Sequence, residues 1–553
     1  MSRVLFALAL LAVGTGALAQ QPPTGGAIRV PTPPPAPRTE PEMRIQDGSN
    51  AAPAAPADAV RIVVRTLRVE GATVFPEAEL LALTGFRAGS ELSMADLNAM
   101  ALRITDLYRR SGYFVAQAYL PAQDIRDGAV TIAVSEGRLG QVQLHNRSNL
   151  HDSVANSALA GLHPGDVLAI APVERRLLLL SDLPGLNIGS TLVPGSVVGT
   201  SDLIVDVAQG RRVTGSIDAD NAGDRFTGQY RLGATIDLNE PLGLGDVASL
   251  RLLTSGEGLK YARASYQLTA GIAQVGVAYS GLEYKLGKEF ESLGAHGTAQ
   301  IASVWGRYPA IRSRNDNLYL QLAFDARKYE DIVDTVPSKV NRNTHVLMAT
   351  VFGDHRDGWG GGGLDSYFVT WSTGQLDIQT PAALALDAAT AQTNGHYDKL
   401  SFSAMRLQRA GGPFSVYAGV SGQLASKNLD VSEKMELGGI NGVRAYPEGE
   451  AYADEGYLLT LEARVDLPPL PAPIPGHLQL VAFADTGHVT LNHDPFVAGP
   501  NHRTLSGAGV GVNWGDPGNF LLRAFYAFKL GSESATSAPD RSGRFWVQFV
   551  KYL

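Results

Sequence analysis

The sequence predicts a membrane β-barrel of about 16 antiparallel strands, preceded by two small α/β domains. Three observations support this fold class. From about residue 211 onwards polar and apolar residues alternate, and before that point two stretches of similar length share one order of strands and helices. After residue 20 the chain has no uninterrupted apolar run long enough for a spanning helix. A chain that crosses a membrane without such a helix must do so as a closed barrel.

The bulk composition narrows the class of protein. The chain has 553 residues, of which 44% are hydrophobic and only 18% are charged, and its 61 glycines follow no fixed period. It is therefore too long for one ordinary domain and too apolar to be disordered throughout. The net charge of −8 argues against a nucleic-acid partner, which needs a basic face. Because the chain has no cysteine, disulfides and thiolate metal sites are excluded.

Residues 1–19 have the pattern of a cleaved signal peptide. Arg3 gives a basic start, residues 4–13 form an apolar core, and the Ala-Leu-Ala of residues 17–19 supplies a small-x-small cleavage site. The apolar run is about half the ~20 residues that a spanning helix needs, so a retained membrane anchor is the less favoured alternative. Residues 20–59 are rich in Pro and Ala and predict an extended, semi-rigid tether.

Residues 60–136 and 137–209 predict two copies of one β-α-α-β-β unit. In the first copy, Ser93 is expected to cap a long helix whose apolar residues recur at helical spacing. In the second copy, residues 153–162 and 172–182 are expected to be helical. Tandem copies of one small fold are a stronger signal of organisation than either copy alone.

Residues 210–553 are predicted to form the barrel. In residues 229–238, for example, every second residue is apolar and the intervening ones are mostly polar or charged. A soluble sandwich also alternates, but its turns come every ~8–12 residues. Here a strand and its loop take roughly 20 residues, which favours membrane strands with an apolar outer face and a polar lumen. In the last strand, Trp546, Phe549 and Tyr552 are expected to contribute to an aromatic girdle.

An arginine in a glycine-rich loop is the most informative feature of the chain. Arg444 lies in the loop segment GGINGVRAY of residues 438–446, and Asp485 lies on a strand one hairpin later. The alternation in residues 477–485 directs Asp485 into the lumen. A loop folded into the barrel would bring Arg444 to Asp485, where a charge-assisted contact would hold it. The alternative is a surface arginine and an ordinary lumenal aspartate that never meet, and the residues alone favour neither.

The sequence lacks familiar catalytic and metal-binding patterns. It contains no G-x-S-x-G, H-E-x-x-H or Walker-type motif, and its histidines do not have metal-ligand spacing. Gly507, Gly509 and Gly511 alternate in a strand-like segment, so we interpret them as small residues packing in a barrel wall. No enzymatic activity, cofactor or metal is therefore expected. An outer-membrane lipase, with Ser, His and an acid converging on the barrel surface, is a minor alternative.

Several short segments together resemble the motifs of one known family. They are Glu433 with Leu437-Gly438-Gly439 and Val443-Arg444-Ala445-Tyr446, then Phe483-Ala484-Asp485-Thr486-Gly487, Asn239-Glu240-Pro241-Leu242-Gly243, Tyr308-Pro309 with Ile311-Arg312-Ser313, and Tyr113-Phe114 to Tyr119-Leu120-Pro121. On these segments the chain resembles the two-partner secretion outer-membrane transporters of the haemolysin secretion/activation protein family. That family belongs to the wider superfamily of outer-membrane insertases, and the resemblance covers nearly the whole mature chain.

The resemblance implies a protein transporter of the outer membrane. The two repeats would be periplasmic POTRA domains that capture an unfolded partner through a strand edge and a groove, and the barrel would pass this partner outwards. The sixth loop, with Val443, Arg444, Ala445 and Tyr446, would lie in the lumen and be anchored by Asp485. The partners would be outer-membrane lipids and a large exoprotein, an adhesin or a cytolysin, with an amino-terminal secretion domain. The transporter itself is expected to be a monomer that uses no nucleotide or ion gradient.

Two further classes of membrane protein remain as alternatives. A general outer-membrane assembly factor shares the loop arginine and the repeats, although that class more often carries additional repeats. A passive porin has no reason for two tandem periplasmic domains. The chain also departs from the family at Ala445, where the usual residue is Gly, and the methyl group narrows the allowed backbone there.

Overall fold

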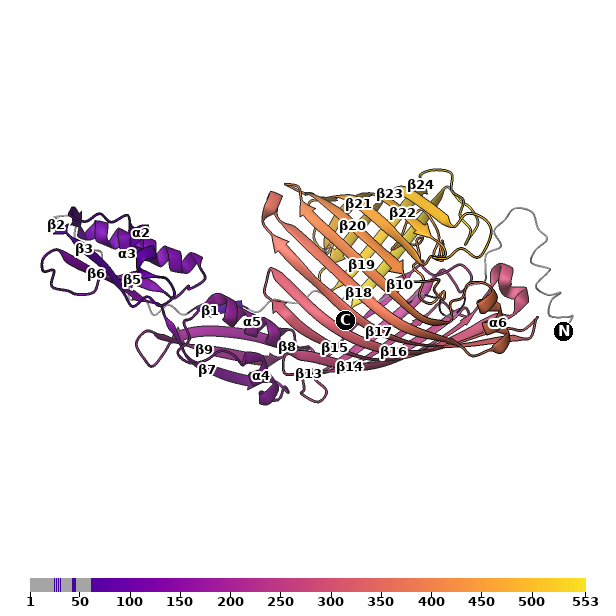
Figure 1. Cartoon of the computed structure of the whole chain (residues 1–553), viewed down its shortest axis with the longest axis horizontal. Coiled ribbons are helices and arrows are strands. Elements are labelled where there is room, and N and C mark those ends of the chain that lie inside the picture. Colours follow the sequence, from indigo (N-terminus) through magenta and orange to yellow (C-terminus); the bar gives the residue numbers. More distant parts are fainter. Residues whose placement is uncertain (1–23, 25, 27, 29, 31–41, 46–60) are drawn as a thin grey trace. The chain divides into compact units, whose positions relative to one another are not determined.

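A computed structural model describes residues 24, 26, 28, 30, 42–45 and 61–553. The expected signal peptide and most of the expected tether lie outside these residues. The chain divides into an α/β unit, Thr39–Arg211 with Leu242–Gly245, and a unit that contains the barrel. Figure 1 shows the helices and strands of both. Within the described residues, none of the helices combines the length and apolarity needed to cross a membrane.

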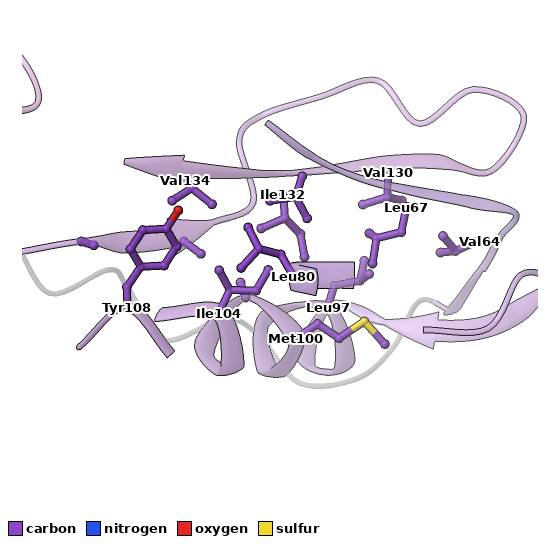
Figure 2. Packing of buried hydrophobic residues seen from close by; sticks show 14 residues of the cluster. Val64, Leu67, Leu80, Leu97, Met100, Ile104, Tyr108, Val130, Ile132 and Val134 are labelled. Atoms are coloured by element: carbon purple, nitrogen blue, oxygen red, sulfur yellow. The ribbon is translucent and has the colours of Figure 1, made fainter. Parts of the chain in front are cut away.

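The first α/β domain consists of two helices packed on a small sheet. Its elements are β2 (Arg61–Val64), β3 (Thr66–Glu70), α2 (Glu77–Thr84), β4 (Ser90–Ser93), α3 (Met94–Arg110), β5 (Gln117–Tyr119) and β6 (Ala129–Ser135). The sheet has the order β3-β6-β5, and β2 pairs with β4 in a separate two-stranded sheet. In Figure 2 the side chains of Leu97 and Ile104 on α3 point toward Ile132 on β6, and all three are fully buried.

The helix α3 begins at the residue that the sequence indicated. Ser93 Oγ accepts a hydrogen bond from the backbone N–H of Asp96 at 3.1 Å, and the Asp96 carboxylate accepts one from the backbone N–H of Ser93 at 2.9 Å. This reciprocal capping box satisfies two donors that the first turn of a helix leaves free. The predicted cap at Ser93 is therefore confirmed.

The second α/β domain has the expected order β-α-α-β-β, whereas the first domain adds the strands β2 and β4 to that order. Its elements are β7 (Arg138–Arg147), α4 (Asp152–Leu159), α5 (Ile170–Ser181), β8 (Leu186–Pro194) and β9 (Thr200–Gln209). Both expected helices are present. A short strand from the tether, β1 (Glu42–Ile45), pairs in parallel with β8 and gives the sheet order β1-β8-β9-β7. This sheet thus accepts an extended segment of chain at its edge.

The remaining strands close into one barrel. They are β10 (Val213–Asp220), β11 (Arg231–Asn239), β12 (Val247–Thr254), β13 (Leu259–Ala270), β14 (Ala273–Lys285), β15 (Ala295–Arg312), β16 (Asp316–Val333), β17 (Ser338–Asp357), β18 (Gly363–Ile378), β19 (Gly395–Arg409), β20 (Phe414–Ala425), β21 (Glu455–Asp466), β22 (His477–Thr490), β23 (His502–Asp516), β24 (Phe520–Lys529) and β25 (Gly543–Tyr552). Each pairs with the next in antiparallel fashion, and β25 pairs with β10. The prediction of about 16 antiparallel strands is confirmed. The loops of the barrel unit carry η1 (Lys288–Leu293), η2 (Trp359–Gly361) and α6 (Pro381–Ala389).

The side chains of the barrel strands alternate between its two faces as the sequence predicts. In β22, Leu480 is 46% exposed on the outer face, while its neighbour Val481 is 3% exposed on the inner face. On the inner face of β23, a Cβ atom on Gly509 would lie 2.4 Å from the ring of Phe483. The glycine thus leaves the space that this lumenal ring occupies, which agrees with our interpretation of the alternating glycines as wall packing.

The expected aromatic girdle in the last strand is wrong for two of its three residues, Trp546 and Tyr552, which alternate to the opposite face from Phe549. Phe549 is 40% exposed on the outer face of β25, whereas Trp546 is 5% exposed and belongs to the buried cluster inside the barrel. Successive side chains of a strand point to opposite faces, so two residues three positions apart cannot share one. This inward tryptophan contacts the arginine loop described below.

Candidate functional site

The loop between β20 and β21, residues 426–454, folds back into the barrel lumen; we call it the sixth loop. Its backbone closes on itself, since Val443 N–H donates to the Leu437 carbonyl at 2.8 Å and Gly439 N–H donates to the Tyr446 carbonyl at 3.1 Å. Gly439 has a φ of +94°, and a Cβ atom on Gly442 would lie 2.3 Å from the carbonyl oxygen of Leu437. Glycine is therefore required at both positions for the loop to fold this tightly.

The side chain of Arg444 is held at the tip of this loop by two carboxylates. Its Nε and Nη2 atoms donate to the two oxygens of Asp485 on β22, each at 2.8 Å, in a bidentate contact. Its Nη1 atom donates to Glu462 on β21, also at 2.8 Å. Asp485 is 2% exposed and Arg444 is 4% exposed, so the pair is screened little by solvent. The contact between Arg444 and Asp485 that the alternation suggested is present in the structure.

Aromatic residues and a second arginine surround the pair. The guanidinium of Arg444 lies 3.5 Å from the ring centroid of Phe483 and 5.2 Å from that of Phe525. The second oxygen of Glu462 accepts hydrogen bonds from Arg464, at 2.8 Å from Nε and 2.7 Å from Nη2. The two guanidinium groups thus balance the charges of the two carboxylates, and the phenylalanine rings exclude water from the Arg444 guanidinium. A buried charge that is paired and hydrogen-bonded in this way is stable only while every partner stays in place.

The backbone at Arg444 is held as firmly as its side chain. Trp546 Nε1 on β25 donates to the Arg444 carbonyl at 2.7 Å, and the Arg444 N–H donates to Asp485 Oδ2 at 3.2 Å. The next residues are also fixed: Tyr446 donates its hydroxyl to the Glu533 carbonyl at 2.9 Å, and Val443 is fully buried. All four residues of the expected lumenal motif, 443–446, are therefore buried, and Val443, Ala445 and Tyr446 belong to the hydrophobic cluster inside the barrel.

Ala445 is accommodated without strain. It is fully buried, and it is not among the described non-glycine residues that have positive φ values. Its methyl group faces Gly507 on β23, where an added Cβ atom would lie only 2.5 Å from that of Ala445. The space for the methyl group at the loop tip thus comes from the missing side chain in the opposite wall.

The part of the sixth loop that precedes its tip is bound to strands on the other side of the barrel. Glu433 accepts contacts from Arg327 Nη1 on β16 at 2.6 Å and from Lys399 Nζ on β19 at 2.7 Å. Asp430 is paired with Arg342 on β17. In the closed ring of strands, β17 lies half a turn from β25. The sixth loop therefore crosses the lumen from one wall to the other.

The site has the character of a polar lock. Among the residues that the structure describes, no group of three His, Cys, Asp or Glu side chains is placed to hold a metal ion. What the arrangement offers is a multiply hydrogen-bonded, charged contact that fixes a loop across a channel. Sequence reasoning missed Glu462 and Trp546 as partners of Arg444. The signal for Glu462 was available, because it shares the inward alternation of β21 with Arg464.

Models of two families match the chain. The model for the haemolysin secretion/activation proteins ShlB/FhaC/HecB matches residues 199–514. The model for the ShlB-type POTRA domain matches residues 62–137. The first match covers more than half of the chain and includes both the sixth loop and the strand that carries Asp485.

The chain is also similar to individual transporters. It is 30% identical to the heme/hemopexin transporter protein HuxB of Haemophilus influenzae (strain ATCC 51907 / DSM 11121 / KW20 / Rd) over 473 residues, which is 84% of this chain and 82% of the relative. It is 23% identical to the outer membrane transporter CdiB of Dickeya dadantii (strain 3937) over 462 residues, 78% of this chain and 76% of the relative. The solved structure of CdiB from Escherichia coli shares the fold, with a TM-score of 0.70 at 21% identity over 92% of this chain and 93% of that one.

Proposed function

Since the chain belongs to the haemolysin secretion/activation protein family ShlB/FhaC/HecB, we propose that its cargo is a large exoprotein with an amino-terminal secretion domain. We also propose that the lock formed by Arg444 and Asp485 keeps the barrel lumen closed between transport events. The protein is a two-partner secretion transporter of the outer membrane, with its POTRA domains in the periplasm.

The sheets of the α/β unit support capture of an extended chain. In the first domain β5 pairs with β6 on one side, and none of the described strands pairs with its other side. In the second domain β1 has already added to β8 in parallel. Free backbone donors and acceptors at a strand edge bind an extended peptide whatever its sequence, which suits an unfolded cargo.

The lock at the loop tip is the observation that carries the proposal. A bidentate arginine–aspartate contact, packed against two phenylalanine rings, holds the sixth loop inside the barrel lumen. A passive pore does not need such a loop, whereas a secretion channel must stay closed to small solutes between cargo molecules. The cargo must displace the loop or pass beside it, so the strength of the contact sets how readily the channel opens.

The test co-expresses the chain with an exoprotein that carries an amino-terminal secretion domain and measures the exoprotein in the medium. Arg444→Ala and Asp485→Ala are expected to abolish secretion while the barrel still migrates as a folded, heat-modifiable band. Arg409→Ala, which changes an exposed arginine at the end of β19, is the matched control and should secrete normally. Normal secretion from both lock variants would refute a role of the contact in transport, and wild-type conductance of both in planar bilayers would refute its role in keeping the lumen closed.

Deletion of residues 60–209 separates the transporter from its alternatives. The deleted protein is expected to lose secretion while the barrel still inserts and conducts. General defects in the assembly of other outer-membrane proteins would instead indicate an assembly factor. Unchanged secretion would show that the POTRA domains do not capture the cargo.

A further inference from the structure

The loop between β24 and β25, residues 530–542, folds over the sixth loop; we call it the eighth loop. Besides the hydrogen bond from Tyr446 to the Glu533 carbonyl, the two loops meet at Glu450 of the sixth loop, which is fully buried. None of the described strand pairings joins the two loops here, so hydrogen bonds and ion pairs of individual residues hold them together. Sequence reasoning gave no indication of this contact, because loop residues follow no period.

The carboxylate of Glu450 is saturated with hydrogen-bond donors from the eighth loop. Thr536 donates to it from its backbone N–H at 2.9 Å and from its hydroxyl at 2.7 Å. Ser537, which is 1% exposed, donates from its backbone N–H at 2.9 Å and from its hydroxyl at 2.7 Å. Successive backbone N–H groups that converge on one anion form a nest for negative charge.

An arginine of the barrel wall completes this cluster. Arg503 Nη1 on β23 forms an ion pair with Glu450. Arg503 also holds the eighth loop directly, through Nε to the Glu533 carboxylate at 3.1 Å and through Nη2 to the Ser534 carbonyl at 2.9 Å. The eighth loop is therefore wrapped around a buried ion pair, one half of which belongs to the sixth loop.

The charge on Glu450 is stable in this environment. Burial raises the pKa of its carboxyl, but the hydrogen bonds from Thr536 and Ser537 and the charge of Arg503 outweigh burial, and the pKa lies below its usual range. The carboxylate is thus ionised at the pH of any ordinary medium. Moving it away would leave a buried arginine and several buried donors without their acceptor, which is strongly unfavourable.

The Glu450 cluster is separate from the lock at the loop tip. The Arg444 side chain bonds to Asp485 and Glu462, and the Glu450 carboxylate bonds to Arg503, Thr536 and Ser537. Within the part of the chain that the structure describes, these two sets share no member. We propose that Glu450 is the positioning residue of a second latch, in which the eighth loop holds the sixth loop in the lumen independently of Arg444, and which must open for cargo to pass. This inference builds on the proposed function.

Ion conductance of the purified full-length transporter in planar bilayers tests the latch without any cargo. In Glu450→Gln, half of the carboxylate becomes an NH₂ group that faces other donors. In the double variant Thr536→Val, Ser537→Ala, the carboxylate loses both hydroxyl donors. Each variant is expected to spend about tenfold more time in open states than the wild type, since one hydrogen bond to a charged group accounts for roughly that factor or more.

Glu291→Gln is the matched control for these variants. Glu291 lies on η1, in a different loop of the barrel unit, and its side chain is exposed. Its substitution should leave the conductance unchanged. Folded, heat-modifiable migration of every variant shows that the barrel is intact. Wild-type conductance in both latch variants, with the barrel folded, overturns the proposal.

A reversible cross-link between the two loops gives a second readout, in which the pore is expected to close rather than to open. The natural chain has no cysteine, so the pair Glu450→Cys, Ser537→Cys can be joined by a reducible bismaleimide without side reactions on other thiols. The unjoined double variant should show raised conductance, the joined form should be closed and unable to secrete, and reduction should restore the open behaviour. Each single-cysteine variant, treated in the same way, is the control.

The outcomes of the cross-link separate the latch from the proposed function. If the joined form secretes cargo as well as the unjoined form, the latch is wrong while the transporter assignment stands. If the wild type secretes no exoprotein but the cross-link still closes the pore reversibly, the latch stands and the proposed cargo is wrong.

Discussion

Trp546 donates its indole N–H to the backbone carbonyl of Arg444 over 2.7 Å. The last strand of the barrel thus holds the backbone of the same residue whose side chain is bound by Asp485 on β22. A loop fixed through both backbone and side chain has little freedom to rotate about its tip. The lock therefore depends on three strands, β21, β22 and β25, rather than on one ion pair.

Trp546→Phe is expected to weaken the lock without changing any charge. Phenylalanine fills most of the space but leaves the buried Arg444 carbonyl without its donor, at a cost of about 1–3 kcal/mol. Bilayer conductance should show more frequent openings than in the wild type. Phe545→Leu, a substitution on the outer face of the same strand, should behave as wild type; equal effects of the two variants would contradict the role of the indole N–H.

Gly507→Ala is expected to push Ala445 out of place. The new methyl carbon would lie 2.5 Å from the Ala445 Cβ atom, far closer than two carbons can approach, and overpacking of this kind costs about 1–3 kcal/mol. Secretion should fall, and Ala445→Gly in the same chain should restore part of it. The rescue is partial because the Phe528 carbonyl oxygen, at 3.2 Å, also crowds the new methyl group. Equal secretion by the single and the double variant would show that the two residues do not act on each other.

Arg444→Lys is expected to lose secretion nearly as completely as Arg444→Ala. A lysine keeps the positive charge but has no planar fork, so it cannot bond to both oxygens of Asp485 and to Glu462 at the same time. Arg409→Lys, at an exposed position at the end of β19, is the matched control and should secrete normally. A lysine at position 444 that secretes normally would mean that charge alone is sufficient.

The stability of the first POTRA domain is expected to depend on Glu136. Burial raises the pKa of this carboxyl, but hydrogen bonds from Thr73, Val74 and Tyr108 outweigh burial and hold the pKa below its ordinary value of 4.5. The folded-state pKa is therefore lower than the unfolded one, so the stabilisation is fully present above pH 4.5 and is lost as the pH falls through the folded-state pKa.

Glu136→Gln should accordingly lower the stability of this domain at neutral pH by about 1–3 kcal/mol and flatten its acid dependence. Hydrogen exchange of the β6 amides in the full-length protein, followed from pH 7 downwards, measures both effects. Glu91→Gln, at an exposed position on β4, is the control. An unchanged acid profile in Glu136→Gln would show that another group is responsible.

Much of the fold could be predicted because membrane strands impose a strict alternation. The same rule directed Asp485 inwards and identified the glycines of β23 as wall residues. It was misapplied at Trp546 and Tyr552, which were assigned to the lipid face although their positions in the alternation are those of the lumen.

The contacts of the two loops were beyond this kind of reasoning. Glu450 and Thr536 are 86 residues apart in the chain and meet only because two irregular loops fold against each other. No period relates such residues, and each of them alone is an ordinary polar residue in a turn. Arg444 was an exception, because its glycine-rich surroundings and a motif shared with a family marked it in advance.

The crossing of the lumen by the sixth loop has a mechanical consequence. A ring of strands joined only by its own hydrogen bonds is easily flattened, whereas a strut between opposite walls resists compression and shear. With Glu433 tied to β16 and β19, and Arg444 tied to β22 and β25, the resting transporter is such a braced ring. A transporter whose sixth loop had left the lumen would lose this brace, and its barrel would be a softer and more deformable cylinder than the braced one.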